Sequence, residues 1–326
     1  MKRLLAIFAI LLAHPVFAQC VDKDADYAEL YPNAWKRALV SADEHPNAEG
    51  VLWRITRDSL PASYLFGTYH FGAADVSPQA KEALRLSADM RILFTELSLE
   101  GHADAKNALR SDPGLIINED PAPLDSWLSP ELSARAAAWL SPLGITPEAA
   151  ARLKPGMLLL MMATPPCLLA SQPEDGFMDQ QIAQHASTAG VDTRGLEEWQ
   201  DQLGFFLDRP TEEQQQMLRW SLLADVDRDI GRVVRKRLYI EEKIMLIWTV
   251  GLEIARALNP SPQIEEAAAK FWKELIIDRN LKMAEVATPE LYKGGVMIAV
   301  GALHLPSKNG LVELLRSRGF AVERVR

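Results

Sequence analysis

Apolar side chains alternate with polar ones, or form short runs, near both ends of the chain. Residues 51–55 (VLWRI) alternate and predict a strand, and residues 64–66 (YLF) after a Pro-containing turn predict its hairpin partner. The same reasoning predicts a helix over 78–88, a buried strand over 91–95, a strand over 295–300, a helix over 309–318 and a last strand over 320–325. Both ends therefore have α/β character.

The segment from about residue 102 to 287 is overwhelmingly helical in pattern. Prolines between residues 121 and 165 divide its first part into short helices. Longer helices are predicted over 178–189, 211–229, 232–258 and 263–287, with one strand near 191–195 and a separate N-terminal helix over 31–42. We expect one α/β domain over 51–326 with a helical insert at about 102–287, preceded by an extension over 19–50.

The two ends of this domain share a local pattern. Gly67-Thr68-Tyr69-His70 and Gly301-Ala302-Leu303-His304 each follow a predicted strand and precede a loop, a helix and another strand. The pattern predicts a central mixed sheet built from two strand–GxxH–helix–strand halves, with the helical insertion between them. Both histidines would then lie just past the carboxyl ends of their strands, where open α/β sheets bind ligands.

The first eighteen residues predict a signal peptide. Lys2 and Arg3 precede an apolar run over 4–12, and Val16-Phe17-Ala18 predicts cleavage between Ala18 and Gln19. A membrane anchor is disfavoured because the run is shorter than the ~20 residues that span a bilayer. Lipid attachment at Cys20 remains an alternative, although Gln19 stands where a lipoprotein signal places a small residue. The expected location is the periplasm or the medium.

The cysteines and charges narrow the picture further. Only Cys20 and Cys167 would remain in the exported chain, and an oxidising compartment predicts a disulfide between them. The net charge of −9 and the absence of a long basic run argue against nucleic acid as a partner. No transmembrane span is expected. Asp225, Asp227 and Asp229 alternate with arginines and predict a solvated helix face.

Glu96 points to metal chemistry. It ends the apolar run 92–95, so its carboxylate should lie at the same rim of the sheet as His70. Two imidazoles and a carboxylate suit Mn²⁺, Co²⁺, Zn²⁺ or Fe²⁺ and would activate water for hydrolysis. Two alternatives remain open: the histidines are satisfied by backbone bonds in separate loops, or Glu96 caps a loop or pairs with an arginine. Serine-hydrolase, phosphate-loop and dinucleotide motifs are absent from the sequence.

Several motifs resemble the TraB/PrgY/GumN family. Residues 64–72 (YLFGTYHFG) are similar to its LFGTxHxG opening, and residues 298–315 to its closing AVGAxHLxGxxGLxxLL motif. Further landmarks lie in the same order at 124–128 (LDSWL), 178–179 (MD), 195–197 (GLE) and 278–280 (DRN). The resemblance covers roughly residues 50–326.

The resemblance implies roles for individual residues. The family is similar to the Tiki metalloproteases, which implies that His70, Glu96 and His304 are ligands or catalytic residues for a divalent ion, with Mn²⁺ or Co²⁺ expected before Zn²⁺ or Fe²⁺. Arg279 and Asn280 would position substrate or an oxyanion, and Glu197 would orient one of these groups from behind. Two departures are Leu303, which stands where many relatives have a small residue and would narrow the pocket, and Tyr69, which replaces an aliphatic residue.

The expectation is thus a periplasmic metal-dependent hydrolase, of Tiki-like metallopeptidase type, with a peptide or small-molecule substrate. The alternative is a non-catalytic periplasmic binding or regulatory module that captures a peptide, iron or haem, since the related ChaN-like fold suggests iron or haem binding. Glu96 beside His70 favours catalysis, because simple capture of a peptide would not need a carboxylate there.

Overall fold

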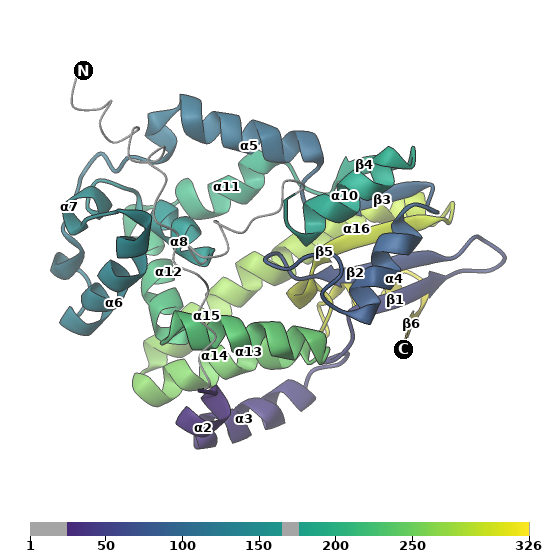
Figure 1. The fold of residues 1–326 in the computed structure, drawn as a ribbon. Coiled ribbons are helices and arrows are strands. Elements are labelled where there is room, and N and C mark those ends of the chain that lie inside the picture. Colours follow the sequence, from purple (N-terminus) through teal and green to yellow (C-terminus); the bar gives the residue numbers. More distant parts are fainter. Residues whose placement is uncertain (1–24, 165–175, 326) are drawn as a thin grey trace.

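A computed structural model describes residues 25–164 and 176–325. The predicted signal peptide, its predicted cleavage site, Cys20 and Cys167 lie outside the described residues. The fold has two connected parts, a sheet covered by helices and a body of helices packed beside it (Figure 1). The fold class is α/β, as the sequence predicted.

The described sheet has six strands in the order β4-β3-β5-β2-β1-β6. They are β1 (Leu52–Thr56), β2 (Ser63–Thr68), β3 (Ile92–Thr95), β4 (Asp192–Gly195), β5 (Val296–Gly301) and β6 (Ala321–Arg324). β1 pairs antiparallel with both β2 and β6, whereas β2, β5, β3 and β4 pair parallel to one another. The sheet is therefore mixed, and the predicted β1–β2 hairpin is confirmed.

Helices cover both faces of the sheet. On one face α4 (Pro78–Ser87) and α10 (Met178–Thr188) pack against Leu52, Phe66 and Met297. On the other face α16 (Asp278–Leu291) and α17 (Leu311–Ser317) pack against Leu65 and Ile298. Adjacent strand residues point to opposite faces, so both faces of the central strands need apolar side chains, which explains the unbroken apolar run in β5.

The remaining described helices between β3 and β5 form the helical body, and most of them share an apolar core. They are α5 (Leu99–Ser111), α6 (Pro130–Leu140), α7 (Pro147–Ala150), α8 (Pro155–Ala163), α11 (Trp199–Leu207), α12 (Thr211–Ala224), α13 (Arg228–Ile240), α14 (Ile244–Leu258) and α15 (Pro262–Trp272), with short turns η1 (Pro113–Leu115), η2 (Leu124–Ser126) and η3 (Ser141–Leu143). The N-terminal α2 (Tyr27–Leu30) and α3 (Pro32–Asp43) pack against α13 and α14 (Figure 1). Within the described residues no helix is both long and apolar enough to cross a bilayer.

Several boundaries differ from the predicted ones. The segment predicted as one helix over 232–258 breaks between α13 and α14, where Glu242 adopts a left-handed conformation with φ 58°. The predicted helix 263–287 contains a π-helical turn, η4 (Lys273–Ile277), between α15 and α16. The expected insert over 102–287 also supplies β4, α10 and most of α16 to the sheet layers. It is therefore not a purely helical addition, and the origin of the two GxxH segments as a repeat stays a prediction.

Candidate functional site

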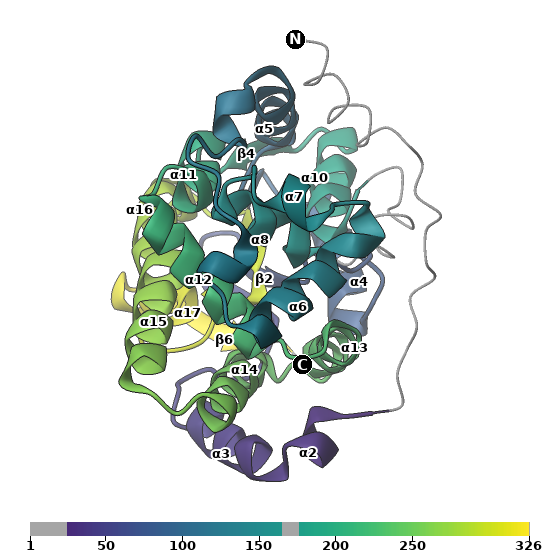
Figure 2. The same cartoon turned by 90° about the vertical axis from the view of Figure 1, so that its left-hand side faces the viewer.

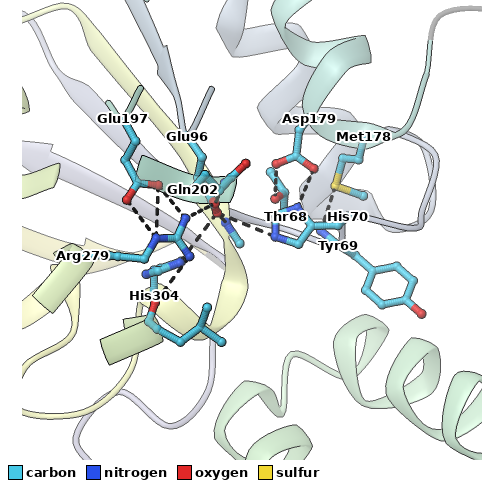
Figure 3. A network of polar contacts seen from close by, with 12 residues as sticks. Thr68, Tyr69, His70, Glu96, Met178, Asp179, Glu197, Gln202, Arg279 and His304 are labelled. Carbon is cyan, nitrogen blue, oxygen red and sulfur yellow. Dashed lines mark hydrogen bonds and ion pairs between the residues drawn. The ribbon is translucent and has the colours of Figure 1, made fainter. Parts of the chain in front are cut away.

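Three neighbouring parallel strands, β2, β3 and β5, deliver the central residues of the candidate site. His70 follows β2, Glu96 follows β3, and His304 ends the short turn η5 (Ala302–His304) after β5. Because the carboxyl ends of parallel strands meet at one edge of a sheet, the three side chains converge there (Figure 3). Nε2 of His70 and Nε2 of His304 each lie 3.7 Å from the same Oε1 atom of Glu96.

Each imidazole is held through its other ring nitrogen. Nδ1 of His70 lies 2.9 Å from Asp179 Oδ2, and Nδ1 of His304 lies 2.7 Å from Asn280 Oδ1. Asp179 also accepts a hydrogen bond from Thr68, two residues before His70. Partners of this kind fix the ring orientation, and they leave each Nε2 facing Glu96.

Burial and neighbouring charges give the two histidines different pKa values. Burial lowers the pKa of His304 to about 3, so its imidazole is neutral. Burial also lowers the pKa of His70, but the Asp179 and Glu96 carboxylates outweigh this effect and raise that pKa to about 9. His70 is half exposed, whereas His304 is buried. The pair therefore holds one neutral and one protonated ring at neutral pH.

Glu96 is buried and ionised. Burial raises the pKa of its carboxyl, but Arg279 and the two histidines hold the pKa well below its usual range. Nη2 of Arg279 donates to Glu96 Oε2 at 2.6 Å, the backbone N–H of Gly301 donates to Oε1 at 2.7 Å, and Gln202 adds a third bond at 3.2 Å. The alternative in which Glu96 pairs with an arginine is therefore what the structure shows.

Arg279 lies between two carboxylates. Its Nη2 also donates to Glu197 at 2.5 Å, its Nε donates to Glu197 at 2.8 Å, and its Nη1 donates to the carbonyl of Leu275. Glu197 thus lies beside Glu96, and the two carboxylates share Nη2 of Arg279 (Figure 3). A guanidinium has five N–H groups and these bonds use four of them, so Arg279 orients Glu96 while Nη1 keeps one N–H beside the pocket.

Asn280 lies directly behind His304. Its side chain is fully buried, and Nδ2 donates to the backbone carbonyls of His304 and Asn309 at 3.2 and 2.9 Å. Because Oδ1 already bonds His304, the amide has no group left for substrate or an oxyanion. Asn280 therefore orients His304 from behind, and its expected help in positioning substrate or an oxyanion, which would act through His304, stays a prediction.

The residues suit a divalent ion in type but are not arranged to hold one as they stand. Among residues 25–164 and 176–325 no group of three or more His, Cys, Asp or Glu side chains forms a metal-binding arrangement. A separation of 3.7 Å is too long for a hydrogen bond, but two ligands that each lie ~2.1 Å from a shared ion can be that far apart. Both imidazoles face Oε1 of Glu96, while Arg279 and Gln202 bond its other oxygen, Oε2.

A pocket of about 370 Å³ opens beside these groups. Besides the residues above it is lined by Tyr69, Arg235 and Tyr239, and by Leu275 and Ile276 of the π-helical turn. The ring of Tyr69 stacks on Tyr239, so it packs in this wall, and Leu303 also lines the pocket. π-Helical turns are frequent at functional sites because they redirect the residues that follow them, here Arg279.

Comparison with known proteins adds one result. A model of the TraB/PrgY/gumN family matches residues 51–324, which is most of the chain. The chain belongs to the TraB/PrgY/gumN family. No curated protein and no solved structure matches the sequence. Membership of the TraB/PrgY/gumN family therefore rests on the sequence match, while the site geometry of this member comes from its own structure.

Sequence reasoning missed several residues of this TraB/PrgY/gumN site. Asp179 was visible only as part of a family landmark, because its contact with His70 joins residues 109 positions apart. Gln202, Arg235 and Tyr239 carry no local signal that links them to the strand ends. Asp225 was expected on a solvated face, but it is part-buried and pairs with Arg235 at 2.9 Å, since α12 ends just before it.

Proposed function

We propose that this protein is a metal-dependent hydrolase that acts on a carbonyl group of a peptide or small-molecule substrate. The observation that carries the proposal is the convergence of two individually oriented imidazole Nε2 atoms on one oxygen of Glu96. Catalytic metal sites commonly combine three such protein ligands with positions left for water and substrate. The family match and the adjacent pocket are consistent with this function.

In the proposed site His70, His304 and Glu96 would hold a divalent ion, with Mn²⁺ or Co²⁺ expected before Zn²⁺ or Fe²⁺. The chemistry that such an ion supplies is Lewis-acid polarisation of a carbonyl and activation of water near neutral pH. His304 already presents a neutral ring, and Asp179 would keep the His70 ring in place when it loses its proton. Arg279 would contribute its positive field and the remaining N–H of Nη1 near the developing charge.

The proposed setting is the periplasm or the medium, reached by cleavage after Ala18. A disulfide between Cys20 and Cys167 would fit that oxidising compartment. Mass spectrometry of the secreted protein tests both points, because the mature mass reveals the cleavage site and alkylation before and after reduction reveals the bond. A lipid on Cys20 would appear as a mass increase and would replace the disulfide proposal.

The site itself is tested by metal-dependent thermal stabilisation. Mn²⁺ or Co²⁺ at about 100 times its Kd should stabilise the wild type by ~2.7 kcal/mol. The His70→Ala/His304→Ala double variant should lose this stabilisation, whereas His185→Ala, an exposed histidine on α10, should keep it. Equal stabilisation of all three proteins, or none, would remove the metallohydrolase proposal.

A peptide screen by mass spectrometry, with and without a chelator, then tests the reaction. Cleavage that is lost on chelation and restored by Mn²⁺ is the expected result. The competing function, capture of iron or haem without turnover, would instead appear as visible absorbance of the purified protein and no cleavage.

A further inference from the structure

We call the 370 Å³ pocket beside the two histidines the catalytic pocket. A second cavity lies next to it in the helical body. It has a volume of about 260 Å³ and is walled by Trp139, Leu159, Met162, Trp220, Trp248 and Phe271. These side chains come from α6, α8, α12, α14 and α15, the helices that Figure 2 places toward the viewer. We call this cavity the aromatic chamber. Cavities of only ~150 Å³ already bind benzene, so the chamber has room for a bulky side chain.

The aromatic chamber adjoins the catalytic pocket. Phe71, Arg235, Ile247 and Leu303 line both cavities. Phe71 follows His70 directly, and Leu303 precedes His304 directly. A substrate whose reacting carbonyl lies beside the two histidines would therefore have a neighbouring group close to the chamber wall.

The charged residues of the chamber are already partnered. Arg228 donates to the carbonyls of Met162 and Thr164 and lies over the ring of Trp139. Arg235 pairs with Asp225 at 2.9 Å, and the hydroxyl of Tyr27 lies 3.0 Å from the other oxygen of Asp225. An ionised occupant would compete with these pairs and lose its hydration, whereas an apolar occupant only replaces water against aromatic surface.

We propose that the aromatic chamber binds a bulky apolar side chain of the substrate, so that the enzyme selects peptides with an aromatic or long aliphatic residue beside the reacting carbonyl. The proposal rests on the function proposed above, because it takes the catalytic pocket as the place of reaction. It assigns the selectivity to the helical body rather than to the strand ends that carry the histidines.

Binding is tested without turnover. N-phenyl-1-naphthylamine is a neutral apolar dye. When bound in the chamber it should fluoresce by energy transfer from the tryptophans that line the chamber. Gly251 lines the chamber, and a Cβ atom there would meet Ala224 at ordinary contact distances of 3.4 and 3.6 Å. Gly251→Leu should therefore fill the chamber and weaken dye binding at least ~10-fold. Ala103→Leu on α5, an exposed position, should bind dye like the wild type.

Competition on the wild type keeps the test independent of any variant's folding. N-acetyl-phenylalanine amide should displace the dye at concentrations at least ~10-fold lower than N-acetyl-glycine amide or N-acetyl-lysine amide. Equal displacement by the three amides, or unchanged dye binding in Gly251→Leu with an intact fold, would overturn the proposal. Displacement by long-chain fatty acids but not by the phenylalanine amide would also overturn it in favour of a lipid site.

The two proposals fail in different ways. The His70→Ala/His304→Ala variant should still bind the dye and prefer the phenylalanine amide, because neither residue lines the chamber. Lost metal stabilisation in every protein together with retained selectivity would remove the hydrolase function and leave the chamber as a binding site. Retained metal stabilisation without selectivity would remove the proposed binding role of the chamber and leave the hydrolase function.

Discussion

At the scale of single residues, Glu96 is the most constrained group of the site. It is buried, and its charge is tolerated because Arg279, a backbone N–H and Gln202 all donate to it. Removing one partner of a buried ion pair leaves an uncompensated charge, which costs about 3–5 kcal/mol. The stability of the protein should therefore depend on the protonation of this carboxyl.

Replacing Arg279 tests this dependence. In the wild type the pKa of Glu96 is depressed, so its contribution to stability is present above the unfolded pKa and is lost as pH falls. In Arg279→Met burial should raise that pKa, so ionisation opposes folding and the variant loses stability as pH rises. We expect the Tm difference from the wild type to widen between pH 4 and pH 8, as measured by circular dichroism.

Arg85→Met provides the control, since Arg85 forms an exposed pair with Glu82. Its effect should stay within about 0.5 kcal/mol at every pH. A Tm difference for Arg279→Met that does not change with pH would mean that Arg279 is not what keeps Glu96 ionised.

The close packing around Gly301 explains why the second GxxH motif begins with glycine. A Cβ atom at this position would lie 2.6 Å from His70 Nε2 and 3.2 Å from Glu96 Oε1. Gly301→Ala should therefore displace the His70 ring and weaken Mn²⁺ binding at least ~10-fold, because partners of metal ligands have effects of this size. Titration of metal-dependent stabilisation measures it.

Gly251→Ala is the matched control, since its Cβ meets only ordinary contacts. It should bind Mn²⁺ like the wild type and be equally or more stable, because alanine favours a helix interior over glycine. Unchanged Mn²⁺ binding in Gly301→Ala would show that the close approach of this backbone does not shape the site.

At the scale of elements, the strand ends could be predicted and the helix junctions could not. His70, Glu96 and His304 each follow an apolar strand, and the geometry of parallel strands brings such positions to one rim. The break at Glu242 depends on its side chain accepting a bond from the backbone N–H of Val51, a contact across 191 residues. No local pattern encodes that contact, so the sequence predicted one long helix instead of α13 and α14.

The π-helical turn at Lys273–Ile277 sets how α15 and α16 are oriented relative to each other, which can be tested. Ile264 and Ala268 of α15 face the core of the helical body, whereas Met283 and Ala284 of α16 face the sheet. One extra residue in the turn lets both faces meet their own cores. Deleting Lys273, an exposed residue, should rotate one helix by ~100° against its core and destabilise the protein by several kcal/mol.

Chemical denaturation measures this loss of stability. Lys273→Ala, which removes the side chain but keeps the residue count, should change stability by less than about 1 kcal/mol. Equal stability of the deletion variant and Lys273→Ala would show that the turn does not set the direction of either helix.

At the scale of the whole molecule, the site is assembled from both parts of the fold. The sheet supplies the histidines and Glu96, while the helical body supplies Gln202, Arg235 and Tyr239. The strand rim followed from local pattern, but the packing of the helical body over it depends on contacts between residues more than 100 positions apart. This is why the candidate ligands could be predicted and the pocket around them could not.

Tyr239 ties the two parts together and supports a last prediction. Its hydroxyl donates to the carbonyl of Gly67 at 2.8 Å, three residues before His70, and its side chain is buried in the core on the α4 and α10 face of the sheet. Because the parts share this core, we expect one cooperative unfolding transition, with far-UV circular dichroism and tryptophan fluorescence changing together.

Tyr239→Phe should lower the free energy of unfolding by about 1–3 kcal/mol, since it leaves the Gly67 carbonyl buried without this donor. Tyr292→Phe, at an exposed position with only a 3.5 Å contact to the carbonyl of Arg318, should have little effect. The transition of Tyr239→Phe should stay single, because the apolar contacts of the ring remain. Separation of the two signals in the wild type would instead mean that the helical body and the sheet fold independently, and the site would then form only when both are docked.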